Sequence, residues 1–255
     1  MRFGLFLAPF GEFADPRRVT GVATRAEEAG FDGLFLWDHV RYAPFAERIA
    51  DPWVTLAAIA GATERLVIGP MVTPLARRRP HKLARETVTL DHLSNGRLVL
   101  GVGLGSERLG EFGPFGDEDD GRQRARRLDD GLELLDRYWH GELQPTPVQQ
   151  PRIPVWVASV YPRRAPLRRA ARWDGWFPIG VERPEQLAEH RDHVQRLRKA
   201  TGTAAKPYDI AVQGRPGTDH RPWEEAGATW WLWGFGHAPE PSALEAAIAA
   251  GPPAS

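Results

Sequence analysis

Eight short apolar segments recur along the chain, and most of them are separated by segments with helical periodicity. They span residues 2–7, 33–37, 66–70, 97–102, 153–158, 174–178, 207–213 and 228–233. Several are continuously apolar rather than alternating, which is typical of parallel strands buried on both faces. Eight such units in 255 residues predict an α/β protein with a (β/α)8 barrel. An open doubly wound sheet shows the same alternation and is the alternative.

Helix boundary signals support this order of elements. Asp15-Pro16 and Asp51-Pro52 each combine an N-cap residue with proline at the first helical position. A seventh helix, within TDHRPWEEAG, is expected to be short. Stretches rich in proline and glycine are confined to loops and the tail, so we expect a single barrel domain over residues 1–255.

Composition narrows the classes of partner. The formal net charge is +0, which predicts no nucleic-acid or membrane partner. Arginine clusters at 77–79 and 122–127 are interpreted as solvated helix faces and loop ends. The chain has no cysteine, so disulfides and thiolate chemistry are excluded. No charge-free run reaches the roughly 18 residues of a membrane-spanning helix. We therefore expect a cytoplasmic protein.

The segment DGLFLWDHV, residues 32–40, ends an apolar strand on an acid and a histidine. The active site of a (β/α)8 barrel lies at the carboxyl ends of its strands, so Asp38 and His39 are expected at the mouth. A histidine transfers protons near neutral pH, and the acid beside it can hold a hydrogen bond to a ligand. The alternative is that Asp38 caps a turn and His39 is a surface residue.

Other strand ends carry residues that suit a ligand site. In chain order they are Met71, Val72, Thr73, Gly103, Gly105, Glu107, Ala158 and Ser159. The first three form an uncharged wall, and the two glycines let a ligand come close. The last two are small residues that lead into a helix, where backbone N–H groups can approach an anion. A flat aromatic cofactor with a phosphate tail fits this set.

Three other features of the sequence have more than one interpretation. GVGLGS has Ser106 where a dinucleotide fingerprint requires glycine, and no helix follows at once. Asp38, His39 and Glu107 suit a metal, but no spaced set of ligands accompanies them and adjacent strand residues point to opposite faces. No metal is therefore expected. Trp233 ends its strand, and is interpreted either as core or as part of a substrate wall.

Three longer segments carry a family resemblance. They are EEAGFDGLFLWDH from Glu27, TPLARRRPHKLARETVTLDHLSNGRLVLGVGLG from Thr73 and IPVWVASVYPRRAPLRRAARWDGWFP from Ile153. Together they resemble the luciferase-like monooxygenase family of flavin- and deazaflavin-dependent oxidoreductases. The resemblance implies a (β/α)8 barrel that binds FMN or coenzyme F420 at the carboxyl ends of its strands. The chain is short for this family, which implies a compact barrel without the insertion that commonly closes over substrate.

The resemblance also implies a set of cofactor contacts. They are Asp38, His39, Met71, Val72, Thr73, Gly103, Gly105, Ala158, Ser159 and Val160. The Asp-His pair matches the family's pair at the ring. Met71-Val72 matches the bulge behind the ring, where a cis peptide bond is common. The segment 158–160 matches the phosphate loop, although many members have Gly-Gly where this chain has Ala158-Ser159.

The function expected from the resemblance is hydride transfer, or oxygen activation, through bound F420 or FMN on a small organic substrate. His39 is then the proton donor or acceptor, Asp38 positions the ring, and Glu107 is a second acid. Phe6, Phe10 and Trp233 are expected to line the substrate pocket. A homodimer is common in the family. The alternatives are a flavin-binding protein without turnover and a metal-dependent barrel isomerase or lyase.

Overall fold

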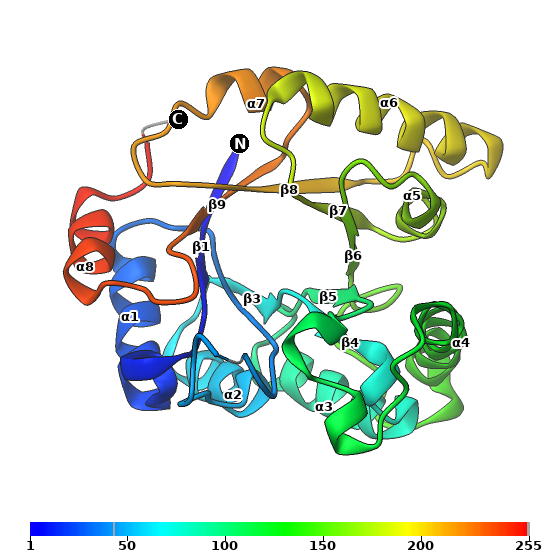
Figure 1. Ribbon diagram of the computed structural model, residues 1–255, viewed down its shortest axis with the longest axis horizontal. Coiled ribbons are helices and arrows are strands. Elements are labelled where there is room, and N and C mark those ends of the chain that lie inside the picture. Colours follow the sequence, from blue (N-terminus) through cyan, green and yellow to red (C-terminus); the bar gives the residue numbers. More distant parts are fainter. Residues whose placement is uncertain (43, 254–255) are drawn as a thin grey trace.

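The strands form a ring with the helices outside it (Figure 1). The computed structural model describes residues 1–42 and 44–253. Its strands are β1 (Arg2–Leu7), β2 (Gly33–Leu36), β3 (Val67–Pro70), β4 (Thr73–Pro74), β5 (Leu100–Gly103), β6 (Val155–Val160), β7 (Gly175–Ile179), β8 (Asp209–Gly214) and β9 (Trp230–Gly234). Its α-helices are α1 (Pro16–Glu28), α2 (Pro52–Ala62), α3 (Pro80–Leu93), α4 (Gly121–Arg137), α5 (Ala165–Ala170), α6 (Pro184–Ala200), α7 (Arg221–Glu225) and α8 (Pro241–Ala250).

The strand order around the ring is β3-β2-β1-β9-β8-β7-β6-β5-β4, and the paired strands are parallel. β3 and β4 are two parts of the third strand position, separated by Met71 and Val72, whose peptide bond is cis. A parallel bridge between Ile68 and Leu98 joins β3 to the segment that leads into β5. The ring therefore closes around eight strand positions. The predicted (β/α)8 barrel is confirmed, and the open sheet is excluded.

The helix N-caps predicted from the sequence are present in the structure. Asp15 Oδ1 accepts the backbone N–H of Arg17, and Asp51 Oδ1 accepts that of Val54, both at 2.9 Å. The seventh helix, α7, has only five residues, as predicted. α3 and α8 differ from α1 and α2 at their starts. Neither has a side-chain N-cap hydrogen bond, so the signal that marks α1 and α2 is missing there.

The barrel interior is filled by aromatic side chains, of which Trp156 and Trp230 lie at the amino-terminal ends of their strands. Its buried residues include Phe6, Phe35, Trp156, Phe177 and Trp230. The Trp156 and Trp230 ring centroids lie 5.5 Å apart, and Arg2 lies over Trp230 at 4.4 Å. Arg2 also pairs with Asp209 at 3.1 Å. Because this end is packed, a ligand site falls at the opposite end, where the strands finish.

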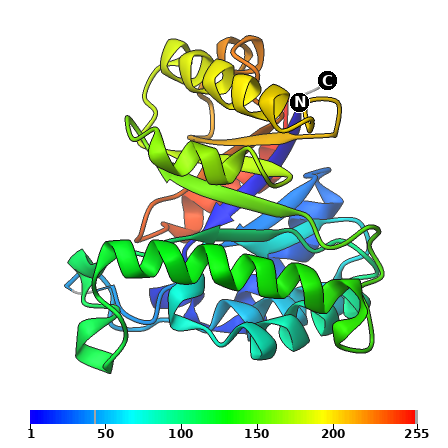
Figure 2. The same cartoon turned by 90° about the vertical axis from the view of Figure 1, so that its right-hand side faces the viewer.

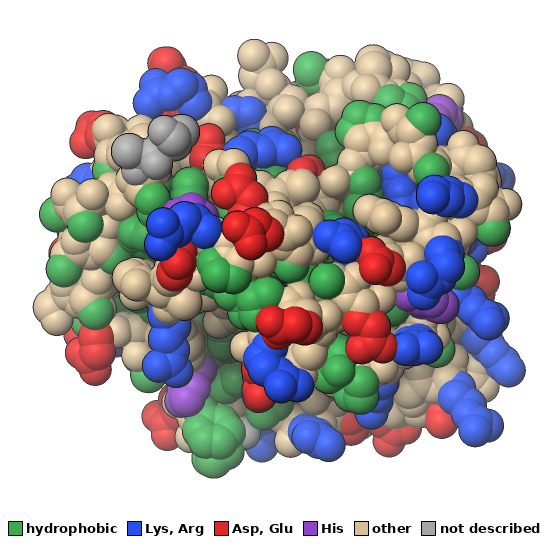
Figure 3. Space-filling view, turned by 90° about the horizontal axis from the view of Figure 1, so that it is seen from above, with side chains coloured by type: hydrophobic (Ala, Val, Ile, Leu, Met, Phe, Trp, Pro, Cys, Tyr) green, Lys and Arg blue, Asp and Glu red, His purple; other side chains and the backbone are tan. Residues whose placement is uncertain are grey.

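A second apolar layer lies between the strands and the surrounding helices. Side chains on the outward side of the strands, such as Leu5 and Leu34, pack there against helix residues such as Val22 and Leu56. Figure 2 shows α4 and α6 on the outside, with strands running between them. On the face seen in Figure 3, acidic and basic side chains are interspersed. In the described part of the chain, no helix has the length and apolar character needed to cross a membrane.

Two glycines allow the third strand position to approach β5 closely. A Cβ atom at Gly69 would lie 2.0 Å from the backbone oxygen of Val99. One at Gly101 would lie 2.3 Å from the backbone oxygen of Pro70. Since the obstructing atoms belong to the backbone, a methyl group at either position requires the strands to separate.

Gly69→Ala is therefore expected to destabilise the barrel by about 3 kcal/mol, which lowers Tm by roughly 6–12 °C. Gly61→Ala is the matched control, because a Cβ atom there meets no atom within 4 Å and the position lies inside α2. This variant is expected to melt at the wild-type temperature or slightly above it. A Gly69→Ala protein that melts within about 2 °C of wild type would contradict the close approach.

Glu27, at the end of α1, anchors the start of β3. Its Oε1 atom accepts the backbone N–H groups of Arg65 at 2.6 Å and Leu66 at 2.9 Å, and Glu64 donates at 3.1 Å. Partial burial raises the pKa of Glu27, but these backbone donors and the charge of Arg65 outweigh it and lower the pKa below 4.5. Glu27 therefore stabilises the fold above its unfolded pKa, and this stability is lost as pH falls through the folded pKa.

We expect the Tm of wild type to fall more steeply between pH 5 and pH 3 than that of Glu27→Gln, which has no charge to lose. Thermal melts across that range measure the difference. Glu28→Gln is the control, since the neighbouring Glu28 is exposed. Parallel Tm curves for wild type and Glu27→Gln would show that Glu27 is not the anchor described.

Candidate active site

His39 follows β2 at the mouth of the barrel and is surrounded by aromatic rings. Its ring centroid lies 4.9 Å from that of Tyr42, 5.8 Å from that of Trp37 and 5.9 Å from that of Phe10. The side chain keeps 21% of its exposure, so the ring is accessible from one side. Since Phe35 lies in the lumen, strand periodicity places Trp37 and His39 on the same side.

A buried carboxylate lies beside the His39 ring. Glu111 Oε2 is 3.0 Å from Nδ1 of His39, and the Glu111 side chain is fully buried. The two atoms are at ion-pair distance, although the ring is not aligned for a hydrogen bond in this conformation. Glu111 Oε1 accepts from Arg77 at 3.2 Å and from the backbone N–H of Val40 at 3.1 Å. The acid is thus fixed next to Nδ1, which leaves Nε2 as the ring nitrogen for a ligand.

Asp38 lies behind the mouth rather than in it. Its side chain is 1% exposed and accepts from Arg77 and Arg78, each at 2.8 Å. The hydroxyl of Thr73 donates to it at 2.8 Å, and the indole of Trp53 on α2 donates at 3.3 Å. With two arginines and two further donors on one carboxylate, Asp38 joins the end of β2 to α2 and to the segment after β4.

The arginine cluster at 77–79 differs from its sequence interpretation. The side chains of Arg77 and Arg78 are only 5% and 18% exposed, so the expectation of a solvated cluster is wrong for these two. They are buried because Asp38 and Glu111, which are themselves buried, require partners. Arg77 bridges the two acids, and so connects the backbone on either side of His39.

Two acids follow β5, and only one of them reaches His39. Glu107 accepts the backbone N–H groups of Phe112 at 3.1 Å and Gly113 at 3.3 Å, so its side chain closes a turn within its own loop. Phe112 is fully buried and lies between Arg124 at 4.4 Å and Arg77 at 6.0 Å. Packing of Phe112 draws its neighbour Glu111 toward β2. Glu107 was the acid predicted from the sequence, and the acid that lies beside His39 is Glu111.

Tyr42 forms the rim next to His39. Burial raises the pKa of the Tyr42 hydroxyl, and the negative charge of Glu111 raises it further. The hydroxyl therefore stays protonated at neutral pH. Tyr42 also stacks on His237 at 5.8 Å, so the loop after β2 contacts the loop after β9.

The side of the mouth formed by β3 to β5 is uncharged and tightly packed. Met71 is 2% exposed. A Cβ atom at Gly103 would lie 2.8 Å from Cγ2 of Val72, and one at Gly105 would lie 2.6 Å from the Phe112 ring. Gly105 also has φ +69°, which favours glycine. Thr73 faces Asp38 rather than the mouth.

At the end of β6, Val160 faces the mouth and Ser159 faces the outer layer. Ser159 is 4% exposed, and its Oγ accepts from the indole N–H of Trp176 at 2.7 Å. Val160 is 48% exposed and pairs in register with Ile179, which is 39% exposed. Ala158 packs with the lumen residues. Two apolar side chains therefore remain open at adjacent strand ends.

The three residues predicted for a substrate pocket are not all together. Phe6 lies in the lumen, 5.4 Å from Phe177, and Phe10 lies beside His39. Trp233 packs in the outer layer, 5.1 Å from Phe31, and is only 5% exposed. Phe235, two residues later, instead lines a cavity at the carboxyl ends of β7, β8 and β9.

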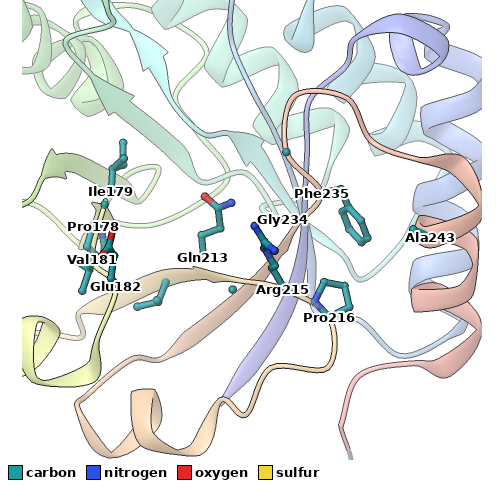
Figure 4. Close-up of a pocket in the computed structure, with 14 residues that line it drawn as sticks. Pro178, Ile179, Val181, Glu182, Gln213, Arg215, Pro216, Gly234, Phe235 and Ala243 are labelled. Carbon is teal, nitrogen blue, oxygen red and sulfur yellow. The ribbon is translucent and has the colours of Figure 1, made fainter. Parts of the chain in front are cut away.

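The cavity at the carboxyl ends of β7, β8 and β9 has a volume of about 840 Å³. Figure 4 shows Gln213 and Arg215 from β8 and its following loop, with Phe235 nearby. Ligand pockets commonly measure 300–1,000 Å³, so this space is sufficient for a cofactor-sized or substrate-sized molecule.

The residues at the mouth fit a flat ring system. Val160 and Ile179 expose apolar surface next to the cavity, which a planar ligand would cover. The indole N–H of Trp37 is buried without a partner among the described residues. In those same residues no group of three His, Cys, Asp or Glu side chains is arranged to hold a metal.

Comparison with known proteins places the chain in a family. The sequence model of the luciferase-like monooxygenase family matches residues 1–250. The chain therefore belongs to the luciferase-like monooxygenase family, and the resemblance seen in its sequence is confirmed.

Individual proteins that resemble this chain share between 29% and 37% of the aligned residues with it. An F420-dependent glucose-6-phosphate dehydrogenase of Beutenbergia cavernae is 37% identical over 147 residues, which cover 56% of this chain and 42% of that protein. An F420-dependent hydroxymycolic acid dehydrogenase of Mycobacterium tuberculosis is 32% identical over 180 residues, covering 63% and 48%. The chain thus matches less than half the length of these two relatives. An uncharacterised protein of Mycobacterium bovis is 29% identical, covering 97% and 95%.

Solved structures support the fold. An F420-dependent secondary alcohol dehydrogenase in complex with an F420–acetone adduct has a TM-score of 0.81 at 16% identity, covering 97% of this chain and 96% of that one. The F420-dependent tetrahydromethanopterin reductase of Methanopyrus kandleri has a TM-score of 0.76 at 16% identity, with the same coverage. A Pseudomonas putida Baeyer–Villiger monooxygenase in complex with FMN has a TM-score of 0.71 at 19% identity, covering 84% and 67%.

Proposed function

We propose that this chain is an oxidoreductase that transfers a hydride between bound F420 or FMN and a small organic substrate at the mouth of the barrel. The observation that carries the proposal is the His39–Glu111 pair, 3.0 Å apart, at the end of a barrel whose mouth also holds a cavity of about 840 Å³. F420 is favoured over FMN because two relatives are named as F420-dependent dehydrogenases.

When bound, F420 or FMN supplies the ring that accepts or donates the hydride. Met71, Val72 and Gly103 would lie behind that ring, with Gly105 at its edge. We assign the phosphate end to the backbone at 158–160. The Ser159 side chain is turned to the outer layer, where its Oγ accepts a hydrogen bond from Trp176, so backbone N–H groups are what this segment would offer an anion.

His39 moves the proton that accompanies hydride transfer. Glu111 holds the Nδ1 side of the ring, so Nε2 donates to or accepts from the substrate oxygen. Asp38 acts through other residues, since its carboxylate is occupied by Arg77, Arg78, Thr73 and Trp53. We propose a positioning role for Asp38 and for Glu107, rather than contact with the reacting atoms.

Turnover tests this function directly. The purified chain is incubated with F420 and a panel of alcohols, and loss of the oxidised F420 absorbance is followed. Reduced FMN with oxygen and a panel of ketones forms the second arm. Reduction of F420 by at least one alcohol is expected. A protein that binds a cofactor but leaves every substrate and oxygen unchanged would instead be the binding protein without turnover.

A homodimer and a cytoplasmic location belong to the same proposal. The exposed side of α2 carries Val54, at 67% exposure, together with Ala58 and Ala62, and none of these is charged. A second copy of the chain is what we expect to cover this face. Sedimentation of the intact protein at twice the chain mass is the expected result, and a monomer would reject the dimer.

A further inference from the structure

The cavity at the ends of β7 to β9 has an uneven lining. Its wall consists largely of glycine backbone and apolar side chains, such as Ile179, Val181 and Phe235. The side chains with strong hydrogen-bonding groups are Gln213, Arg215 and Glu182. An apolar wall with few polar groups orients a ligand by one end.

Arg215 is the cation of this cavity. In Figure 4 its guanidinium extends from the loop after β8 toward Gly234, near the centre of the view. Within residues 1–42 and 44–253, Arg215 forms no ion pair with a carboxylate, and every arginine that does so is a different one. The donors of Arg215 are therefore available to a ligand.

Gln213 supplies a second donor beside Arg215. A Cβ atom at Gly234 would lie 2.4 Å from Nε2 of Gln213, so the glycine provides the space that the amide group occupies. Figure 4 shows Glu182 on the other side of Gln213 from Arg215. Among the residues that the structure describes, no ion pair joins Glu182 to Arg215.

The aromatic side chains of Phe6 and Trp37 lie between this cavity and His39. Gly234 pairs in register with Phe6, and the Phe6 ring lies 5.5 Å from that of Trp37. Trp37 in turn lies 5.8 Å from His39. The apolar body of a molecule held at Arg215 would therefore lie against these aromatic side chains, on the side of the cavity that faces the proposed proton-transfer residue.

We propose that this cavity binds substrates with an apolar body and a single oxyanion group, a carboxylate or a phosphate, which Arg215 binds and Gln213 supports. This inference rests on the proposed function, because it names the substrate class of the same site. Hydrogen bonds between a guanidinium and an oxyanion are charge-assisted and geometrically specific. The apolar side chains in the wall suit the body of such a substrate.

Isothermal titration calorimetry of the full chain tests the proposal with four probes: octanoate, octyl phosphate, 1-octanol and inorganic phosphate. Octanoate or octyl phosphate is expected to bind at least about tenfold more tightly than 1-octanol, and inorganic phosphate much more weakly than octyl phosphate. The tighter of the two anions identifies the oxyanion. Arg215→Gln is expected to weaken its binding by about ten- to a hundredfold.

Arg17→Gln is the matched control, because it removes the same charge from an exposed position on α1, and it should bind as wild type does. Unchanged anion binding by Arg215→Gln, or equal binding of 1-octanol, would overturn the proposal. Anion binding that depends on Arg215, without any cofactor turnover, would reject only the oxidoreductase function. Turnover together with anion binding that is independent of Arg215 would reject only the inference made for this cavity.

Discussion

His39→Ala is expected to lower kcat by roughly 10²- to 10⁴-fold, because it removes the group that exchanges a proton with the substrate. The dissociation constant for F420 or FMN should change by less than about threefold, since the cofactor contacts proposed at Met71, Val72 and the end of β6 remain. Stopped-flow turnover and a fluorescence titration, using the ten tryptophans of the chain, measure the two quantities.

His237→Ala is the matched control for this variant. His237 is a second imidazole at the mouth, but it is exposed and stacks on Tyr42 instead of facing a buried acid. Its replacement should leave kcat within about threefold of wild type. If His39→Ala instead abolishes cofactor binding and keeps its rate per bound cofactor, His39 is a binding residue and not the proton carrier.

Glu111→Gln is expected to reduce kcat by roughly 10- to 10³-fold, with little change in cofactor affinity. A carboxylate that orients a histidine controls which ring nitrogen faces the substrate, and an amide does this poorly. Arg77 loses one of its two carboxylate partners and keeps Asp38, so a fall in Tm is also expected. The separation of kcat from cofactor affinity distinguishes a role at His39 from a general loss of structure.

Glu107→Gln is the control for Glu111→Gln, because it lies four residues earlier in the same loop. It should affect Tm more than kcat, since Glu107 accepts backbone N–H groups and does not approach His39. The double variant that combines Glu111→Gln with His39→Ala completes a double-mutant cycle for these two residues. If Glu111→Gln lowers kcat as much in the His39→Ala background as in wild type, Glu111 does not act through His39.

The strands were predictable because each is a compact apolar run between boundary signals. All eight predicted strands coincide with observed ones, and their ends shift by no more than three residues. The sequence contains no signal that the third strand is interrupted between β3 and β4. The residues there are apolar like those around them, so only the family resemblance indicated the cis bond at Met71-Val72, which the structure contains.

The side that each strand residue faces was harder to infer. Strand periodicity separates Asp38 from His39, and Trp230 from Trp231 and Trp233, but it does not say which set faces the lumen. Packing against neighbouring side chains decides which set faces the lumen. Trp230 packs inside against Phe35, so Trp233 is directed to the outer layer.

The partners of the strand-end residues were the least predictable part of the site. Glu111 is 72 residues from His39 in the sequence, and Arg77 reaches both Asp38 and Glu111 through loops. No periodicity connects such positions. The one local signal was that Phe112, an apolar residue in a polar loop, follows Glu111 and must be buried somewhere.

The most direct measurement is a crystal structure of the chain grown with F420, and another grown with FMN. We predict that the ring lies against Met71 and Val72, with a substrate analogue placing its oxygen within about 3.2 Å of His39 Nε2. A cofactor bound away from the strand ends, or a ring that leaves His39 beyond hydrogen-bond reach of any reacting atom, would contradict the central claim that the mouth of this barrel is a redox site.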